Sequence, residues 1–500
     1  MKKSEINIPA DNAETTRKRA VINLSGAAFG SVVTIANEIL AARFLGVSSY
    51  GLFAIGMLLV KMSELISNFG MPVTIMHLIP LYRERGERFK IVDTVIAVLT
   101  LSLIIAVVLA ITLWILAPLI AGNLFNKPAA TDYVRLLVLV IPLLSLTEII
   151  GQITRAYGHA HYYVLIRNVM APVCYGVLLL ALIGCASPGI HITLAYVSAY
   201  FIALIFAFRF LYGVVGESLD AYKTSFQWGE IYRYSWPVFV NILLYMVFRW
   251  TDIFVVGIYL DVDDIGRYRG CLQVVVIFEL VSMSIGAAVA HQYSVLERSG
   301  NLTQAQEIFM DNVRWITLLV APLAVLISVN SSDILGLLGN DFVQARDVLT
   351  ILTLAYTAKA IGLSLGLVLV ITGRQGIETR IAAIVVVVNL ILNFVLVPVM
   401  GAPGAATATL LASILFTLLR VFEVNRNLHL RYPTFKVASL LLMAFGLGAI
   451  IYYIMPLLFG IGALVQLLLL ILALTAMTWR YSLTLEERVW IGTIIRGQRS

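Results

Sequence analysis

Charged residues are scarce in this chain of 500 residues, at 13% of the sequence, whereas hydrophobic residues make up 60%. Soluble domains carry about 25% charged residues, because their surfaces face water. A soluble fold cannot bury this much apolar surface, but a lipid bilayer can cover it. The composition therefore excludes an ordinary soluble protein and predicts an integral membrane protein.

Cysteine is also scarce, and the signatures of common catalytic sites are missing. The three cysteines, Cys174, Cys185 and Cys271, lie in or beside apolar segments without the paired spacing of a zinc site or a disulfide. The sequence contains no HExxH, no P-loop and no recognisable Ser/His/Asp set. We therefore expect no catalysis, no cofactor and no metal site.

Positive charge is present in excess but is not concentrated. The net charge is +7, and its lysines and arginines are scattered through short loops. A nucleic-acid-binding protein gathers such charge on one face, so nucleic acid is not an expected partner. Residues 1–19 are polar and are followed by an apolar run too long for a signal peptide. We expect this tail to stay in the cytoplasm.

Long apolar runs dominate the rest of the chain. A membrane-spanning helix needs about 20 mostly apolar residues, and about fourteen segments meet that requirement. The predicted helices lie near 20–44, 50–75, 90–118, 133–154, 161–183, 191–212, 234–259, 266–290, 313–337, 346–371, 378–399, 404–424, 437–456 and 460–479. The fold class is therefore all-α, as a polytopic membrane protein.

The distribution of lysine and arginine sets the predicted orientation. Cytoplasmic loops are enriched in these residues. With a cytoplasmic N-terminus, 26 of the 35 fall in inner segments, six in outer segments and three inside helices. An error of one helix would invert every later loop, so the asymmetry supports fourteen helices with both termini in the cytoplasm. The tail 481–500 mixes apolar and charged residues and is predicted to be amphipathic.

The two halves of the chain resemble each other at a nearly constant offset. The matched pairs are Glu38 with Asp252, Gly56 with Gly270, Glu64 with Glu279, His77 with His291, Gly86 with Gly300 and Arg167 with Arg380. Six helices in each half give two lobes of the same orientation, an arrangement found in transporters. The predicted organisation is a tail 1–19, an N-lobe 20–212, a cytoplasmic linker 213–233, a C-lobe 234–427, two further helices within 428–480 and the tail 481–500.

Ionisable residues inside the predicted helices are the candidate functional residues. Each costs about 2.5–3.5 kcal/mol at a lipid-facing helix centre, so such residues usually face a polar cavity or a partner. Lys61, Arg249 and Lys359 are the candidate ligands for an anionic substrate. Candidates for ion coupling are Glu38, Glu64, Glu148, Asp252 and Glu279. The alternative interpretation is that these charges form neutral pairs that hold helices together; Lys61 and Glu64 share a helix face at i,i+3, as do Arg249 and Asp252.

Five segments carry a resemblance to known proteins. They are AARFLGVSSYGLF at 41–53, RAYGHAHYYVLIRN at 155–168, SWPVFVNILLYMVFRWTDIFVVG at 235–257, ILGLLGNDFVQARDVLTILTLA at 334–355 and NLILNFVLVPVMGAPGAATATLLAS at 389–413. Together they resemble the polysaccharide transporter (oligosaccharide flippase) family, which belongs to a superfamily that also contains multidrug and toxic-compound exporters and lipid II flippases. They occur in the family's order and together span most of residues 20–425.

The resemblance implies a flippase of the inner (cytoplasmic) membrane. Such a protein moves a polyprenyl-pyrophosphate-linked oligosaccharide to the outer leaflet by alternating access, for surface polysaccharide synthesis. The implied partners are the bilayer, the glycolipid, and a polysaccharide polymerase or glycosyltransferases. A multidrug–cation antiporter of the same fold and a flippase for peptidoglycan precursors stay open as alternatives. A membrane polymerase or ligase is disfavoured, because the outer loops are short.

Overall fold

The computed structural model describes residues 13–182, 188–215, 228–299, 302–454 and 472–473. Every element in these ranges is a helix, which confirms the all-α prediction. Twelve helical stretches are long and apolar enough to cross a membrane. The described residues form two compact units, one within Met1–Gly266 and the other within Arg267–Ser500.

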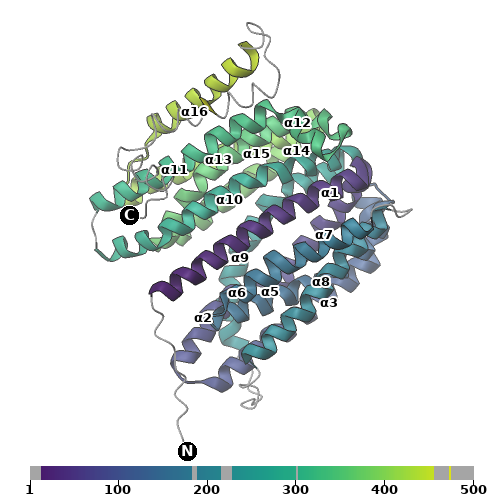
Figure 1. The fold of residues 1–500 in the computed structure, drawn as a ribbon, viewed down its shortest axis with the longest axis vertical. Helices are drawn as coiled ribbons and strands as arrows, with labels where there is room; N and C mark the ends of the chain where they lie inside the picture. The colour runs from purple at the N-terminus through teal and green to yellow at the C-terminus, as the bar shows by residue number, and fades with distance from the viewer. Residues whose placement is uncertain (1–12, 183–187, 216–227, 300–301, 455–471, 474–500) are drawn as a thin grey trace, which may run out of the picture. The chain divides into compact units, whose positions relative to one another are not determined.

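The first unit is built from helices that run side by side. Its elements are α1 (Ala13–Asn68), α2 (Met71–Glu84), α3 (Arg88–Leu119), η1 (Ile120–Leu124), α4 (Ala130–Leu137), α5 (Val140–Ala156), α6 (Ala160–Tyr163), η2 (Val164–Met170), α7 (Ala171–Ala181), α8 (Pro188–Val215) and α9 (Trp228–Tyr259). Figure 1 shows α1, α5, α7 and α8 packed alongside one another. A buried apolar cluster joins α2, α3, α5, α8 and the start of α9.

The second unit contains the remaining helices, and α10 crosses the boundary between the units. Its elements are α10 (Val262–Ser299), α11 (Leu302–Val329), α12 (Ser331–Leu338), η4 (Asn340–Ala345), α13 (Arg346–Ile371), α14 (Gln375–Met400), α15 (Ala402–Leu428), α16 (Thr434–Ala449) and η5 (Ile450–Ile454). Helix α15 packs against α13 and α14, and α16 packs against α11.

Apolar side chains cover the outside of the helices as well as the core. Along α3, the side chains of Ile104, Val108, Ile111 and Ile115 are each more than half exposed. Their spacing places them on one face of the helix. Such a stripe is unfavourable in water and favourable against lipid. The structure therefore agrees with a multi-pass membrane protein.

The first two predicted helices meet at a kink in the structure, with no separate loop between them. They lie largely within α1, in which the backbone leaves helical geometry at Gly46, with φ 69° and ψ 171°. Glycine adopts this positive φ without a steric penalty, so the chain turns there without a separate loop. The last predicted helix, 460–479, lies outside the described residues except for 472–473. The count of fourteen helices thus stays a prediction, as do the lobe boundaries.

The second predicted helix, 50–75, is interrupted. Phe69 and Gly70 have positive φ values of 42° and 72°, and α2 begins at Met71 and extends to Glu84. Pro72 in the first turn of α2 favours a helix start at this point, because its missing N–H has no partner there in any case. The predicted boundary at 75 is wrong, because the apolar pattern runs across a break that glycine and proline produce.

Candidate functional site

The first ion pair inside the membrane helices lies on α1. Lys61 Nζ is 2.8 Å from Glu64 Oε2, as their i,i+3 spacing predicts. The Glu64 side chain is 8% exposed and the Lys61 side chain is 26% exposed. The carboxylate is thus buried, while part of the lysine chain stays accessible.

A second ion pair connects two helical segments of the same unit. Glu148 on α5 forms an ion pair with Arg167 on η2. Gln152, one turn further along α5, donates a hydrogen bond to the same carboxylate over 2.9 Å. Sequence reasoning did not predict this contact of Arg167. One available signal was its match with Arg380 in the internal repeat. A π-helical segment such as η2 is also frequent at functional sites.

Glu38 lies closer to the joint at Gly46. It is half-buried, and its carboxylate accepts a hydrogen bond of 2.6 Å from the hydroxyl of the fully buried Tyr50. The preceding residue, Asn37, donates to the carbonyl of Pro172 over 2.7 Å. These two contacts tie this part of α1 to its own continuation and to α7.

Helix α9 carries the predicted pair Arg249 and Asp252. Asp252 is 4% exposed, and its Oδ1 accepts a hydrogen bond of 2.8 Å from the backbone N–H of Ile253. Arg249 is half-buried. Near the C-terminal end of α9, the Lys127 ammonium donates a hydrogen bond to the Gly257 carbonyl over 2.9 Å. Burial lowers the pKa of this ammonium, and the Asp261 carboxylate opposes the shift.

The second unit contains its own buried pair. Lys359 Nζ on α13 lies 2.6 Å from Glu279 Oε1 on α10. The two side chains are only 4% and 8% exposed, and the ammonium also lies 4.8 Å from the centre of the Tyr356 ring. This pair joins two helices that are far apart in the sequence. Lys61, Glu64 and Glu148 thus lie within the first unit, and Lys359 and Glu279 within the second.

Buried polar groups on α14 and α15 were missed by sequence reasoning. Asn389 and Asn393, one turn apart on α14, and Ser413 on α15 are at most 1% exposed. Both polar side-chain atoms of Asn389, Oδ1 of Asn393 and Oγ of Ser413 have no hydrogen-bond partner among the described residues. A buried unsatisfied group costs about 1–3 kcal/mol. Asparagine at i,i+4 in an apolar helix was a signal for such a site.

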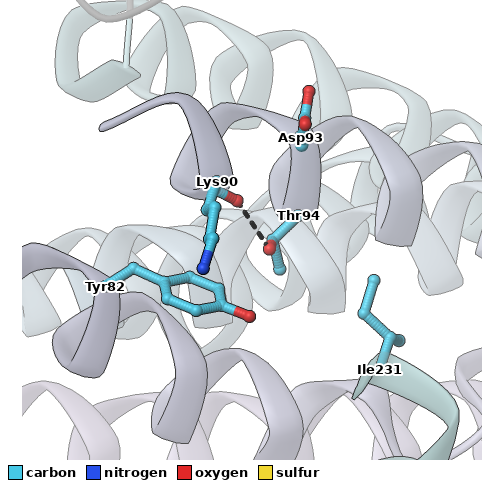
Figure 2. A pocket seen from close by; sticks show the side chains of 5 residues that line it. All are labelled: Tyr82, Lys90, Asp93, Thr94 and Ile231. Atoms are coloured by element: carbon cyan, nitrogen blue, oxygen red, sulfur yellow. Dashed lines mark hydrogen bonds between the residues drawn. The ribbon is translucent and has the colours of Figure 1, made fainter. Parts of the chain in front are cut away.

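A small pocket lies where α2, α3 and α9 meet. Its lining residues are Tyr82, Lys90, Asp93, Thr94 and Ile231. Figure 2 shows the Lys90 side chain pointing toward the Tyr82 ring, and the ammonium lies 5.4 Å from the ring centre. The Tyr82 hydroxyl donates to Glu230 at the start of α9 over 2.6 Å. No group of three or more His, Cys, Asp or Glu residues suited to a metal occurs among the described residues.

Comparison with protein families gives two matches. Residues 18–291 match the family described as "Polysaccharide biosynthesis protein", and residues 237–395 match the family described as MatE. Both are families of membrane transporters and not of enzymes. The predicted family is therefore confirmed, and the expectation of a transporter is confirmed at the level of the family.

Individual relatives agree with these matches. The chain is 29% identical over 223 residues to a Haloferax volcanii protein named "Probable low-salt glycan biosynthesis flippase Agl15". That alignment covers 44% of this chain and 45% of the relative, so the chain spans about half the length of the curated protein that it matches.

Solved structures match over a larger share of the chain. "Lipid II flippase MurJ, inward closed conformation" is 17% identical, with a TM-score of 0.71, and the match covers 92% of this chain and 99% of that chain. The inward-facing structure of a multidrug resistance MATE family transporter is 14% identical, with a TM-score of 0.70, and covers 84% and 98%. At these identities the likeness shows the fold alone.

Proposed function

Because the chain belongs to the polysaccharide biosynthesis protein family, we propose that it is a flippase for polyprenyl-pyrophosphate-linked oligosaccharide. The match over residues 18–291 is the observation that carries the proposal. The similarity to a protein named as a probable glycan biosynthesis flippase, 29% identical over 223 residues, supports it. The substrate moves from the cytoplasmic to the outer leaflet, for surface polysaccharide synthesis.

Lys61 is the candidate ligand with the best local support. Its side chain is partly exposed although it belongs to a helix long and apolar enough to span the membrane. Its partner Glu64 lies on the same helix, so the lysine can turn toward an anion without any separation of helices. A pyrophosphate is a suitable anion, since cationic side chains form strong charge-assisted hydrogen bonds with phosphate oxygens. Arg249 and Lys359 complete the proposed cationic set, and Lys359 becomes available only when its buried pair with Glu279 separates.

Transport requires that the site opens to one side at a time. We propose alternating access between two lobes, residues 20–212 and 234–427. Two hydrogen bonds support the underlying repeat. Ser67 on α1 bonds Ser145 on α5 over 3.0 Å, and Ser282 on α10 bonds the Ala360 carbonyl on α13 over 3.1 Å. Both pairs are 78 residues apart. An ion gradient is the proposed energy source, with Glu38, Glu64, Glu148, Asp252 and Glu279 as coupling candidates.

The proposed location is the cytoplasmic membrane, with both termini in the cytoplasm. The excess of lysine and arginine in alternate loops supports this orientation. A reporter fused after Gly86, in the loop between α2 and α3, should then be active only in the cytoplasm. Activity in the periplasm or outside the cell would contradict the orientation.

A second candidate function is multidrug–cation antiport. The MatE match over residues 237–395 favours it, and so do the five acidic candidates against three basic ones. A lipid II-type substrate is a further option, since the fold of a lipid II flippase covers 92% of the chain.

Reconstitution separates these candidates. Vesicles containing the purified protein are loaded with a fluorescent polyprenyl-pyrophosphate glycan in the inner leaflet, and its appearance outside is followed with a membrane-impermeant glycosidase. We expect protein-dependent translocation that does not need ATP. Parallel vesicles test a fluorescent organic cation and a peptidoglycan-type lipid. Transport of the cation alone would contradict the proposed function and identify an antiporter, and preference for the peptidoglycan-type lipid would replace the substrate.

A further inference from the structure

Four aromatic rings gather where the break between α1 and α2 meets the beginning of α9. We call this group, Phe69, Tyr232, Trp236 and Phe239, the aromatic platform. The Phe69 ring centre lies 6.1 Å from that of Tyr232, 6.0 Å from Trp236 and 4.6 Å from Phe239. Tyr232 and Trp236 are nearly parallel, with an interplanar angle of 18° and centres 5.9 Å apart.

The backbone holds these rings in place from both sides. Positions 232, 236 and 239 lie on one face of α9 by their helical spacing. Opposite them, Phe69 has a positive φ of 42°, a conformation that costs a residue other than glycine free energy and tends to occur at functional sites. The next residue, Gly70, lies against the Ser235 carbonyl, where a Cβ atom would come within 2.4 Å. Thr74 and Ser235 also share a buried hydrogen bond of 2.8 Å.

The platform is accessible and carries polar groups at its edge. Tyr232 is 55% exposed and Trp236 is 46% exposed. The Tyr232 hydroxyl and the Trp236 indole N–H make no hydrogen bond within the described part of the chain. The exposed surface therefore combines flat apolar faces with hydrogen-bonding edges. A sugar ring has the complementary form, with a C–H face that packs on an aromatic ring and hydroxyl groups around it.

Positive charge lies on the same end of these helices. Arg233 is exposed, and its guanidinium has no partner among the described residues. The last turn of α2, the residues that follow it and the start of α3 add three more exposed arginines, Arg83, Arg85 and Arg88. The hydrogen bond between Tyr82 and Glu230 fixes this end of α2 to the start of α9. Guanidinium groups bind phosphate oxygens well, so the surroundings suit a sugar joined to a pyrophosphate.

We propose that the aromatic platform binds the first sugar of the polyprenyl-pyrophosphate substrate, with Arg233 beside its pyrophosphate, as the substrate enters from the cytoplasmic leaflet. This inference rests on the proposed function and names a docking site for it outside the cationic set. Tyrosine and tryptophan are also common anchors at the membrane interface. An anchor needs only an amphipathic ring, whereas here two rings lie parallel against a third that a strained backbone holds in place.

The test compares two ligands that differ only by the sugar. Wild-type protein in nanodiscs of fixed lipid composition is titrated with a polyprenyl pyrophosphate carrying one hexose, and with the same lipid lacking the hexose. We expect tighter binding of the form with the sugar. The double variant Tyr232→Ala/Trp236→Ala should bind that form about tenfold more weakly, equivalent to about 1.4 kcal/mol. Its affinity for the sugar-free lipid should not change.

Two further variants control for folding and for anchoring. Tyr232→Phe/Trp236→Phe keeps both ring faces and should retain most of the preference for the sugar. Tyr212→Ala removes another exposed ring, 69% accessible, near the end of α8 on the same predicted side of the membrane. That variant should bind both ligands as the wild type does.

The possible contrary results are distinct. Equal losses for both ligands in the alanine double variant would mean that the rings contact the isoprenoid chain, and would overturn the assignment to a sugar. Unchanged binding of both ligands by the alanine double variant would mean that the rings serve only as anchors at the membrane interface. That result would also overturn the assignment to a sugar. If the wild-type protein binds neither lipid and translocates no glycolipid, the proposed function itself fails.

Discussion

Each of the two units contains a carboxylate buried among membrane helices, and the two carboxylates are neutralised in different ways. Glu64 in the first unit and Glu279 in the second occupy matching positions of the sequence repeat, and each pairs with a lysine. The partner of Glu64 lies on the same helix and is 26% exposed, whereas the partner of Glu279 comes from another helix and is 4% exposed.

The difference bears on what each lysine can do. Lys61 can leave Glu64 by a change of side-chain rotamer, and the Arg167 guanidinium also attracts that carboxylate. Lys359 cannot leave Glu279 without exposing two buried charges to an apolar interior, which is strongly unfavourable. We therefore expect the first pair to exchange its lysine with a ligand. The second should hold α10 against α13, or separate only when those helices move.

The largest expected effect is on the stability of the second pair. Lys359→Met leaves Glu279 as an uncompensated buried charge, and breaking such a pair costs about 3–5 kcal/mol. We expect a large drop in the melting temperature of the purified protein and less protein in the membrane. The double variant Lys359→Met/Glu279→Leu removes both charges and should recover most of that loss. If Lys359→Met alone is as stable as the wild type, the pair is not a structural contact.

The next effect is on transport through the first pair. Lys61→Met should leave the melting temperature closer to the wild-type value than Lys359→Met does, because the Lys61 side chain is 26% exposed and that of Lys359 only 4%. Glycan translocation should fall at least about tenfold, since a hydrogen bond to a charged group contributes about 1.5–3 kcal/mol. Lys61→Arg keeps the charge and should retain part of the activity.

The outcome for Lys61 can contradict the comparison in two ways. Full translocation by a folded Lys61→Met protein would remove this lysine from the substrate site. A loss of stability equal to that of Lys359→Met would mean that both pairs are structural, and the contrast between the units would then disappear.

The membrane spans and the contact within one helix could be predicted from the sequence, but the contacts between helices could not. Hydropathy located the spans, and i,i+3 spacing predicted the contact between Lys61 and Glu64, because both signals are local to one helix. The partners of Glu148 and Glu279 lie on other helices, 19 and 80 residues away. Periodicity within a helix carries no information about which faces of distant helices meet.

The break at Phe69 and Gly70 marks another limit of the sequence analysis. The average hydropathy of residues 50–75 predicts an uninterrupted helix, and Gly70 followed by Pro72 was a local signal against that interpretation. The aromatic platform depends on this break, because it brings Phe69 toward rings of α9 that lie more than 160 residues further along the chain. The roles of all candidate site residues stay predictions until the variants are tested.

The smallest expected effect on the melting temperature concerns two serines, Ser145 in the first unit and Ser282 in the second. Each bonds to a neighbouring helix of its own unit. Ser145 bonds Asn68 over 2.7 Å and also contacts Ser67 and Ser102, whereas Ser282 makes one bond to a carbonyl. Hydrogen bonds between membrane helices contribute about 0.6 kcal/mol on average and up to about 1.7 kcal/mol. Ser145→Ala should therefore lower the melting temperature more than Ser282→Ala does.

The exposed Ser284 provides the matched control for that measurement, because within the described residues its hydroxyl bonds only to the Leu280 carbonyl one turn earlier on the same helix. Ser284→Ala should leave the melting temperature in the same detergent unchanged. If Ser282→Ala costs as much as Ser145→Ala, the shared network around Asn68 adds nothing beyond a single bond.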